Sequence, residues 1–217
     1  YGVFALIAVA VAQNGIAVFT NIGWLALCVV IGVGVQIALV HVPLLLFVAK
    51  RKVGRFYRAA IDALAVAFAT ASSAATLPVA LRVAIEKMQI DRGVASTVLP
   101  IGASIGKDGT AMYVGLLSVF SLQALGVTPD PAMLGIVLLT GALAAFGTAP
   151  IPSASLFMLA AVLASVGVST AQTALIIGFV LPFDRLLDMT RTVASASANL
   201  TVTASVSRWE RRDEFLG

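Results

Sequence analysis

The stretch IDALAVAFATASSAATLPVALR, residues 61–82, has two apolar parts separated by a polar interruption. Ten helical residues extend roughly 15 Å, which is half of a hydrocarbon core about 30 Å thick. The interruption TASSAATLP therefore predicts the tip of a re-entrant helical hairpin that enters a membrane halfway and returns. Irregular backbone at that depth must be buried in protein or line a wet cavity. The alternative is one membrane helix that is kinked at Pro78.

The composition is that of an integral membrane protein. Of the 217 residues, 60% are hydrophobic and 11% are charged, whereas about a quarter of the residues in soluble proteins are charged. Residues 22–49 form a nearly uninterrupted apolar run that is long enough to cross a bilayer. The first apolar span starts at Tyr1 without the basic flank and cleavage site of a signal peptide, so we expect the chain to be part of a longer membrane protein.

Basic residues predict the orientation of the chain in the membrane. Most of the Lys and Arg residues fall in three short segments, residues 50–58, 82–92 and 208–212. The positive-inside rule places these segments and the C-terminus in the cytoplasm, and the location expected is the plasma (inner) membrane. The clusters directly flank apolar spans, so topology accounts for them and we expect no nucleic-acid partner.

A second interrupted segment repeats the design from the opposite side of the membrane. Residues 131–167 are apolar, with FGTAPIPSAS (146–155) as the predicted tip. Each hairpin precedes a long span with polar residues halfway, namely 93–125 and 170–207. Two interrupted segments in corresponding halves indicate an inverted repeat and the binding site of a transporter.

The predicted fold is an all-α polytopic membrane protein with two re-entrant hairpins and two broken transmembrane helices. We divide it into a scaffold-type helix, 1–20, and a transport domain, 21–217. The parts of that domain are a helix (21–49), the first hairpin (59–90), a broken helix (93–125), the second hairpin (131–167), a polar last helix (170–207) and a cytoplasmic tail (208–217).

The last span carries a polar stripe on one helical face. Its members recur every three or four residues and are Asp184, Asp188, Arg191, Ser195 and Asn199. Burying an ionised group in lipid costs several kcal/mol, so these residues must face protein or water. A guanidinium fork and a carboxylate three residues apart suit an acidic amino acid, which has a carboxylate and an ammonium. The alternative is a structural network that holds Arg191 between the two aspartates.

Four segments resemble the signature motifs of the dicarboxylate/amino acid:cation symporters, the glutamate transporter homologues. They are SSAATLP (72–78), DGTAMY (108–113), GTAPIPSAS (147–155) and DMTRT (188–192). The resemblance covers essentially the whole chain but only the C-terminal half of a family member. It implies an elevator-type transport domain, a homotrimer, and aspartate or glutamate as the substrate.

The resemblance also implies roles for individual residues. Asp188 would bind the substrate amino group and Arg191 its side-chain carboxylate. The other implied substrate contacts are Ser72, Ser73, Thr110, Thr192 and Ser195. The second hairpin would be the gate, with Gly147, Thr148, Ala149, Pro150, Pro152, Ser153 and Ser155 at its tip.

One motif departs from the family pattern. The family has Asn-Met-Asp-Gly-Thr where this chain has Gly106, Lys107 and Asp108, and Asn199 replaces a sodium-binding aspartate. Our hypothesis is that the Lys107 ammonium replaces a sodium ion, with Asp108 or Asn199 as its partner. The alternative is that Lys107 extends away from the site and some sodium sites survive.

A count of charges supports this hypothesis. The carboxylates of Asp108, Asp184 and Asp188 face the cations Lys107, Arg185 and Arg191, so we expect a neutral core with sodium coupling weakened or lost. Asp108, Asp184 and Asn199 form the cation site with Lys107, and sodium at Asp108 or a proton remains the candidate coupling ion. The sequence leaves open whether Arg185 neutralises Asp184 or touches the first hairpin tip.

The expected function is secondary active transport of aspartate or glutamate. The alternatives are a sodium- or proton-coupled dicarboxylate symporter, an anion-conducting homologue and a degenerate sensor. We expect neither an enzyme nor a cofactor, because the sequence has no nucleophile–base pair, metal-ligand cluster or nucleotide loop. His41 and Cys28 lie alone in an apolar helix and are predicted to be packing residues.

Overall fold

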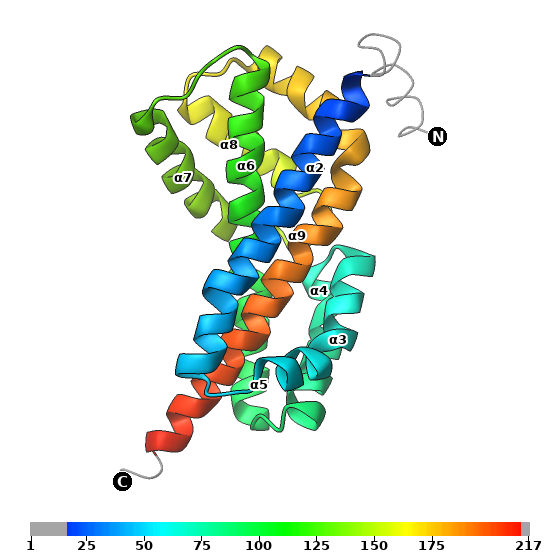
Figure 1. Ribbon diagram of the computed structural model, residues 1–217, viewed down its shortest axis with the longest axis vertical. Helices are drawn as coiled ribbons and strands as arrows, with labels where there is room; N and C mark the ends of the chain where they lie inside the picture. Colours follow the sequence, from blue (N-terminus) through cyan, green and yellow to red (C-terminus); the bar gives the residue numbers. More distant parts are fainter. Residues whose placement is uncertain (1–16, 214–217) are drawn as a thin grey trace.

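The computed structural model describes residues 17–213, and every regular element in that range is helical (Figure 1). The predicted all-α class is therefore confirmed. Most of the expected scaffold helix, 1–20, lies outside the described range.

The longest apolar element is α2 (Ala17–Gln36), which continues through two π-helical segments, η1 (Ile37–His41) and η2 (Leu44–Val48). By length and composition, residues Thr20–Val48 can cross a membrane. Only 22% of the most apolar window in this helix is buried, and its outward side chains include Trp24 and Leu39. A long apolar helix that is exposed along one side suits lipid or a further protein surface better than water.

The segment 61–82 forms a helical hairpin. Helix α3 (Val53–Thr70) ends at Ala71, which has a left-handed φ of 51°. Ser72 then caps α4 (Ser73–Arg82) by accepting a hydrogen bond from the Ala75 amide at 3.2 Å. The chain reverses within these two residues and continues beyond α4 into η3 (Val83–Lys87), so a single kinked helix does not form.

The next span is broken at the predicted position. Helix α5 (Arg92–Ile105) and helix α6 (Asp108–Ala124) are separated by Gly106 and Lys107. A Cβ atom at Gly106 would collide with the Asn199 side chain, so glycine permits this close approach.

The second hairpin joins α7 (Pro131–Phe146) to α8 (Ser155–Ser165) through an eight-residue tip, 147–154. Asp130 caps α7 by accepting a hydrogen bond from the Met133 amide at 2.7 Å. Pro131 occupies the first helical turn, where its missing N–H costs no intrahelical bond.

The prediction of a second broken helix is wrong. Helix α9 runs without interruption from Thr170 to Asp213 and includes most of the expected tail. The backbone helix continues through the polar residues in its middle, and hydroxyls such as those of Thr192, Thr203 and Ser205 are satisfied by carbonyls one turn back. The polar stripe therefore lies on one continuous helix.

Helix α9 is the central element of the structure and packs against α2, α3, α5 and α6. Figure 1 shows α7 and α8 toward one end of the molecule and α3, α4 and α5 toward the other. Each end is packed against α9 by its own apolar cluster. One cluster surrounds Leu45, Phe56 and Leu99, and the other surrounds Tyr113 and Leu159. The two hairpins approach the middle of α9 from opposite ends (Figure 1).

Candidate functional site

The tips of the two hairpins touch each other at the middle of α9. The Ser72 hydroxyl of the first tip donates a hydrogen bond to the Pro150 carbonyl of the second at 2.8 Å. The backbone amide of Ser153 donates to Asp188 Oδ2 on α9 at 2.6 Å. Ser153 has a left-handed φ of 58°, which directs its amide in a turn that helix or strand geometry would not provide.

The centre of the site is a buried ion pair. Arg191 Nη2 lies 2.5 Å from Asp188 Oδ1, and the two residues are 5% and 0% exposed. Arg191 Nη1 donates to Thr110 Oγ1 at 2.5 Å, which links α9 to α6. Removing one member of such a pair leaves an uncompensated buried charge, so the two side chains act as a unit.

A second carboxylate contacts the aromatic residue on which the guanidinium lies. Asp184 is fully buried and accepts a hydrogen bond from the Tyr113 hydroxyl at 2.6 Å. The Tyr113 ring lies under the Arg191 guanidinium, 5.6 Å from the ring centroid. Asp184 therefore reaches Arg191 only through the Tyr113 side chain among the contacts described, and its place in the cation site stays a prediction.

Two hydroxyls of α9 beside the ion pair bond backbone groups. Thr192 Oγ1 donates to the Asp188 carbonyl at 2.7 Å. Ser195 Oγ accepts from the Gly109 amide at 3.2 Å. Gly109 is pressed against α9 so closely that an added Cβ would collide with the Arg191 carbonyl. The start of α6 is thereby positioned against the ion pair.

The predicted partner of Lys107 is wrong. Its ammonium donates to Ser73 Oγ at 3.1 Å, and the side chain is buried. Consecutive residues project in different directions, so Lys107 and Asp108 do not face each other. Asn199 instead lies against Gly102 and Gly106.

Asp108 belongs to a different network, which the sequence motifs did not predict. Its Oδ2 accepts from Gln36 Nε2 at 2.7 Å and lies 3.0 Å from His41 Nε2. The other ring nitrogen of His41 lies 3.1 Å from Ser197 Oγ, which Tyr57 contacts at 3.0 Å. His41 is therefore a buried polar partner, and the interpretation as a packing residue is wrong. An unpaired imidazole within a membrane span is costly, and this cost is the sequence signal that could have predicted a partner for His41.

Arg185 contacts the first hairpin. Its side chain is exposed, and Nη2 donates to the Ala69 carbonyl at 3.4 Å near the C-terminus of α3. A cation is stabilised there by the helix dipole. The neutral count of core charges is corrected accordingly. Among the described residues of the core, Lys107 and Arg191 are the buried cations, and the carboxylates are those of Asp108, Asp184 and Asp188.

The predicted gate residues form the tip of the second hairpin and the start of α8. Gly147, Thr148, Ala149, Pro150, Pro152 and Ser153 lie in the loop, and Ser155 begins α8. Thr148 Oγ1 donates to the Ala144 carbonyl at 3.2 Å, and Ser155 is fully buried. The tip is thus anchored at both of its ends.

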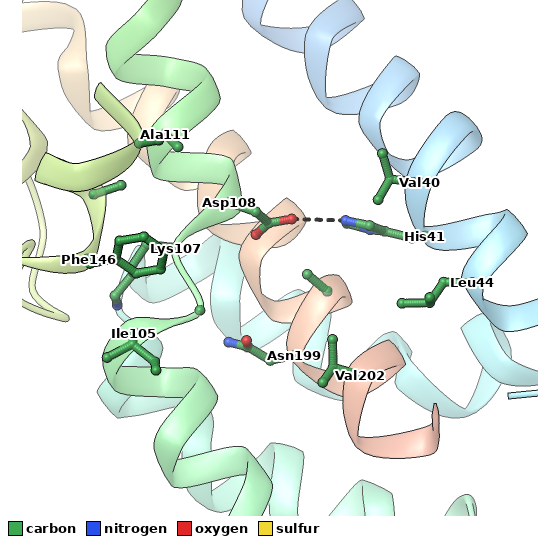
Figure 2. Close-up of a pocket in the computed structure, with 14 residues that line it drawn as sticks. Val40, His41, Leu44, Ile105, Lys107, Asp108, Ala111, Phe146, Asn199 and Val202 are labelled. Carbon is green, nitrogen blue, oxygen red and sulfur yellow. Dashed lines mark hydrogen bonds and ion pairs between the residues drawn. The ribbon is translucent and has the colours of Figure 1, made fainter. Parts of the chain in front are cut away.

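A cavity of about 310 Å³ opens on the other side of the break between α5 and α6. Figure 2 shows His41 and Asp108 facing each other beside it, with Lys107 and Asn199 nearby. The remaining lining residues are apolar, among them Phe146 of α7. Asp188 and Arg191 do not line this cavity, so the ion pair and the Asp108 network are separate parts of the site.

Comparison with known proteins identifies the family. The family described as the sodium:dicarboxylate symporter family matches residues 1–209. The chain belongs to this family. The chain is 37% identical over 183 residues to excitatory amino acid transporter 5 of Mus musculus, covering 84% of the chain and 33% of that protein.

Two other relatives of this symporter-family chain have comparable identities and aligned lengths. Excitatory amino acid transporter 2 of Homo sapiens is 40% identical over 154 residues, covering 70% of the chain and 26% of that protein. Excitatory amino acid transporter 3 of Mus musculus is 34% identical over 197 residues, covering 90% and 37%. The chain thus spans about a quarter to somewhat more than a third of the length of these relatives. The resemblance predicted from the motifs is confirmed.

Proposed function

We propose that the chain is the substrate-carrying part of a secondary active transporter, a symporter of the acidic amino acids aspartate and glutamate. The observation that carries this proposal is the buried pair of Asp188 and Arg191 beneath both hairpin tips. The guanidinium fork suits the side-chain carboxylate of the substrate, and the aspartate suits its ammonium. A dicarboxylate without an amino group would offer Asp188 no cationic group to bind.

The first hairpin supplies the groups for the α-carboxylate. Ser72 and Ser73 lie at the N-terminus of α4, where backbone amides and the helix dipole favour an anion. The Lys107 ammonium touches Ser73 and adds a positive charge there. Thr110, Thr192 and Ser195 complete the proposed contacts.

The second hairpin acts as the gate in this proposal. The Ser153 amide holds Asp188, and Pro150 accepts a hydrogen bond from Ser72. A substrate ammonium that binds Asp188 competes with the Ser153 amide and thereby couples substrate binding to the position of the tip. Gate and site then move together through an inner membrane as an elevator within a homotrimer, with re-entrant hairpins and a cytoplasmic C-terminus.

Sodium coupling is proposed to be weaker than the family pattern implies. Lys107 and Arg191 are cations that the chain itself supplies, and both are 5% exposed. They offset two of the three carboxylates, which leaves one negative charge, at Asp108. The coupling cation is therefore proposed to act at Asp108, where it is either sodium or a proton.

A fully sodium-coupled symporter is the second candidate, and one observation favours it. Asp108 Oδ1 and Gln36 Oε1 are buried and accept no hydrogen bond within residues 17–213. Carboxylate and carbonyl oxygens are hard ligands that suit an alkali cation. Both atoms are free to act as ligands of a sodium ion beside the His41 network in this second candidate.

Calorimetry of the full-length protein with aspartate, with and without sodium and at two pH values, tests both candidates. Tight binding that changes less than tenfold with sodium supports the weakened coupling. Binding that requires sodium supports the second candidate. Absence of aspartate binding under all four conditions would refute the transport of acidic amino acids.

A further inference from the structure

We propose that a basic cavity at the end of α2 binds the phosphate-bearing headgroup of an anionic phospholipid. The cavity has a volume of about 450 Å³ and lies between the end of η2, the start of α3 and the end of η3. The cations among its lining residues are Lys50, Arg51, Lys52, Arg55 and Lys87. No acidic side chain is among the lining residues that the structure describes.

The walls of the basic cavity are tied together. Arg51 Nη1 donates to the Met88 carbonyl at 2.6 Å and joins the turn after η2 to the end of η3. Lys87 pairs at 2.7 Å with Asp62, a residue on the outer side of α3 that does not line the cavity. The backbone segments that carry the remaining cations, Lys50, Lys52 and Arg55, are therefore held around a defined space.

The start of α3 adds to the positive field. Lys52 is its N-cap residue and makes no side-chain capping bond, and the first turn of the helix holds no acidic residue. A helix N-terminus attracts anions and is destabilised by nearby cations. An anion in the basic cavity would bind the free amides and the surrounding Lys and Arg side chains together.

A phosphate can come from a lipid or from solution, and the surroundings favour a lipid. Leu46 and Phe47 are 47% and 77% exposed and lie three to four residues before the basic turn at Lys50. An acyl chain would lie against these residues while the headgroup enters the cavity. This inference rests on the membrane placement proposed above, in which the basic turn lies at the cytoplasmic surface.

The positive-inside rule alone accounts for the number of cations in this loop but not for their arrangement. A topological signal depends on charge and not on which residues line a cavity. A binding site depends on the lining residues specifically. Variants that remove equal charge inside and outside the cavity therefore separate the two explanations.

The test is a titration of the full-length protein with phosphatidylglycerol in detergent, followed by native mass spectrometry. The cavity variant is Lys50→Gln, Lys52→Gln and Arg55→Gln. The matched control is Arg58→Gln, Arg92→Gln and Arg208→Gln, three exposed residues outside the cavity. We expect the cavity variant to lose at least tenfold in affinity, because each basic residue near an anionic headgroup contributes to binding, and the control to stay within twofold.

Equal losses in the two triple variants would overturn the proposal. If the cavity variant does not fold, Arg55→Gln is compared with Arg58→Gln, which lies on the same helix and is exposed. Displacement of the lipid by millimolar inorganic phosphate would assign the cavity to a soluble anion and refute the lipid. Aspartate binding is measured on the same samples, so failure of the transport proposal is recognised separately from failure of the lipid site.

Discussion

The Lys107 ammonium donates a hydrogen bond to the Ser73 hydroxyl at 3.1 Å, across 34 positions of sequence. This contact joins the break between α5 and α6 to the tip of the first hairpin. It places a positive charge next to the groups proposed for the substrate α-carboxylate. The charge of Lys107 therefore belongs with the substrate site and not with Asp108.

Replacing Lys107 by methionine tests this assignment. Lys107→Met removes the charge and keeps the length, so sodium-free aspartate affinity should fall about ten- to a hundredfold, the equivalent of one charge-assisted hydrogen bond of about 1.5–3 kcal/mol. Calorimetry without sodium measures the change. Ser73→Ala, which keeps the ammonium, should lose less. Unchanged affinity in Lys107→Met would show that the ammonium does not act on the substrate.

Replacing Arg191 tests the ion pair. Arg191→Lys keeps a charge but loses the planar fork, so aspartate affinity should fall by at least about a hundredfold, or roughly 3 kcal/mol. Arg185→Lys on the exposed side of the same helix is the matched control and should bind as the parent does. Normal aspartate binding by Arg191→Lys would show that the ion pair has a structural role and does not bind the substrate.

Removal of the Arg191 charge is expected to affect folding as well. Arg191→Met leaves Asp188 buried without its partner, which costs about 3–5 kcal/mol of stability. The double variant Arg191→Met, Asp188→Asn should recover part of that loss. Thermal unfolding in detergent provides the measurement, and full stability of the single variant would contradict the buried pair.

The contact between Gly106 and Asn199 predicts a steric effect. Gly106→Asn adds a side chain that collides with the Asn199 amide, and overpacking of this kind costs about 1–3 kcal/mol. Shortening the neighbour in Gly106→Asn, Asn199→Ala should restore part of the lost Tm. If Gly106→Asn has the Tm of the parent, the two side chains do not share this space.

Variants of His41 distinguish a polar partner of Asp108 from a packing residue. His41→Phe keeps a ring of similar size but leaves Asp108 and Ser197 each without one contact, so stability should fall by about 1–3 kcal/mol. His41→Gln retains one hydrogen-bonding group and should recover part of this loss. Equal Tm values for His41→Phe and the parent would support the packing interpretation after all.

Local features of the sequence predict the main elements of the fold. Ser72 and Asp130 cap helices by accepting hydrogen bonds from amides three residues further along, so their effects follow from nearby residues alone. The spacing of three and four residues likewise predicts that the polar stripe of α9 lies on one helical face. The family motifs add the substrate class as a prediction.

Helix α9 marks the limit of local reasoning. Its polar residues suggested a break, but the helical backbone continues through them and their hydroxyls bond carbonyls of the preceding turn. The proposed tail likewise continues the helix as far as Asp213. A polar composition changes what a helix contacts, and it does not by itself interrupt the backbone.

Helical class, hairpin turns, the break before Asp108 and the stripe with Asp188 and Arg191 were determined by the sequence alone. Only the tertiary structure decided that Lys107 binds Ser73, that Asp108 faces Gln36 and His41, and that Arg185 lies at the surface. The reason is physical. Turns and caps arise from bonds between near neighbours, whereas the partner of a long polar side chain depends on which distant helix packs beside it.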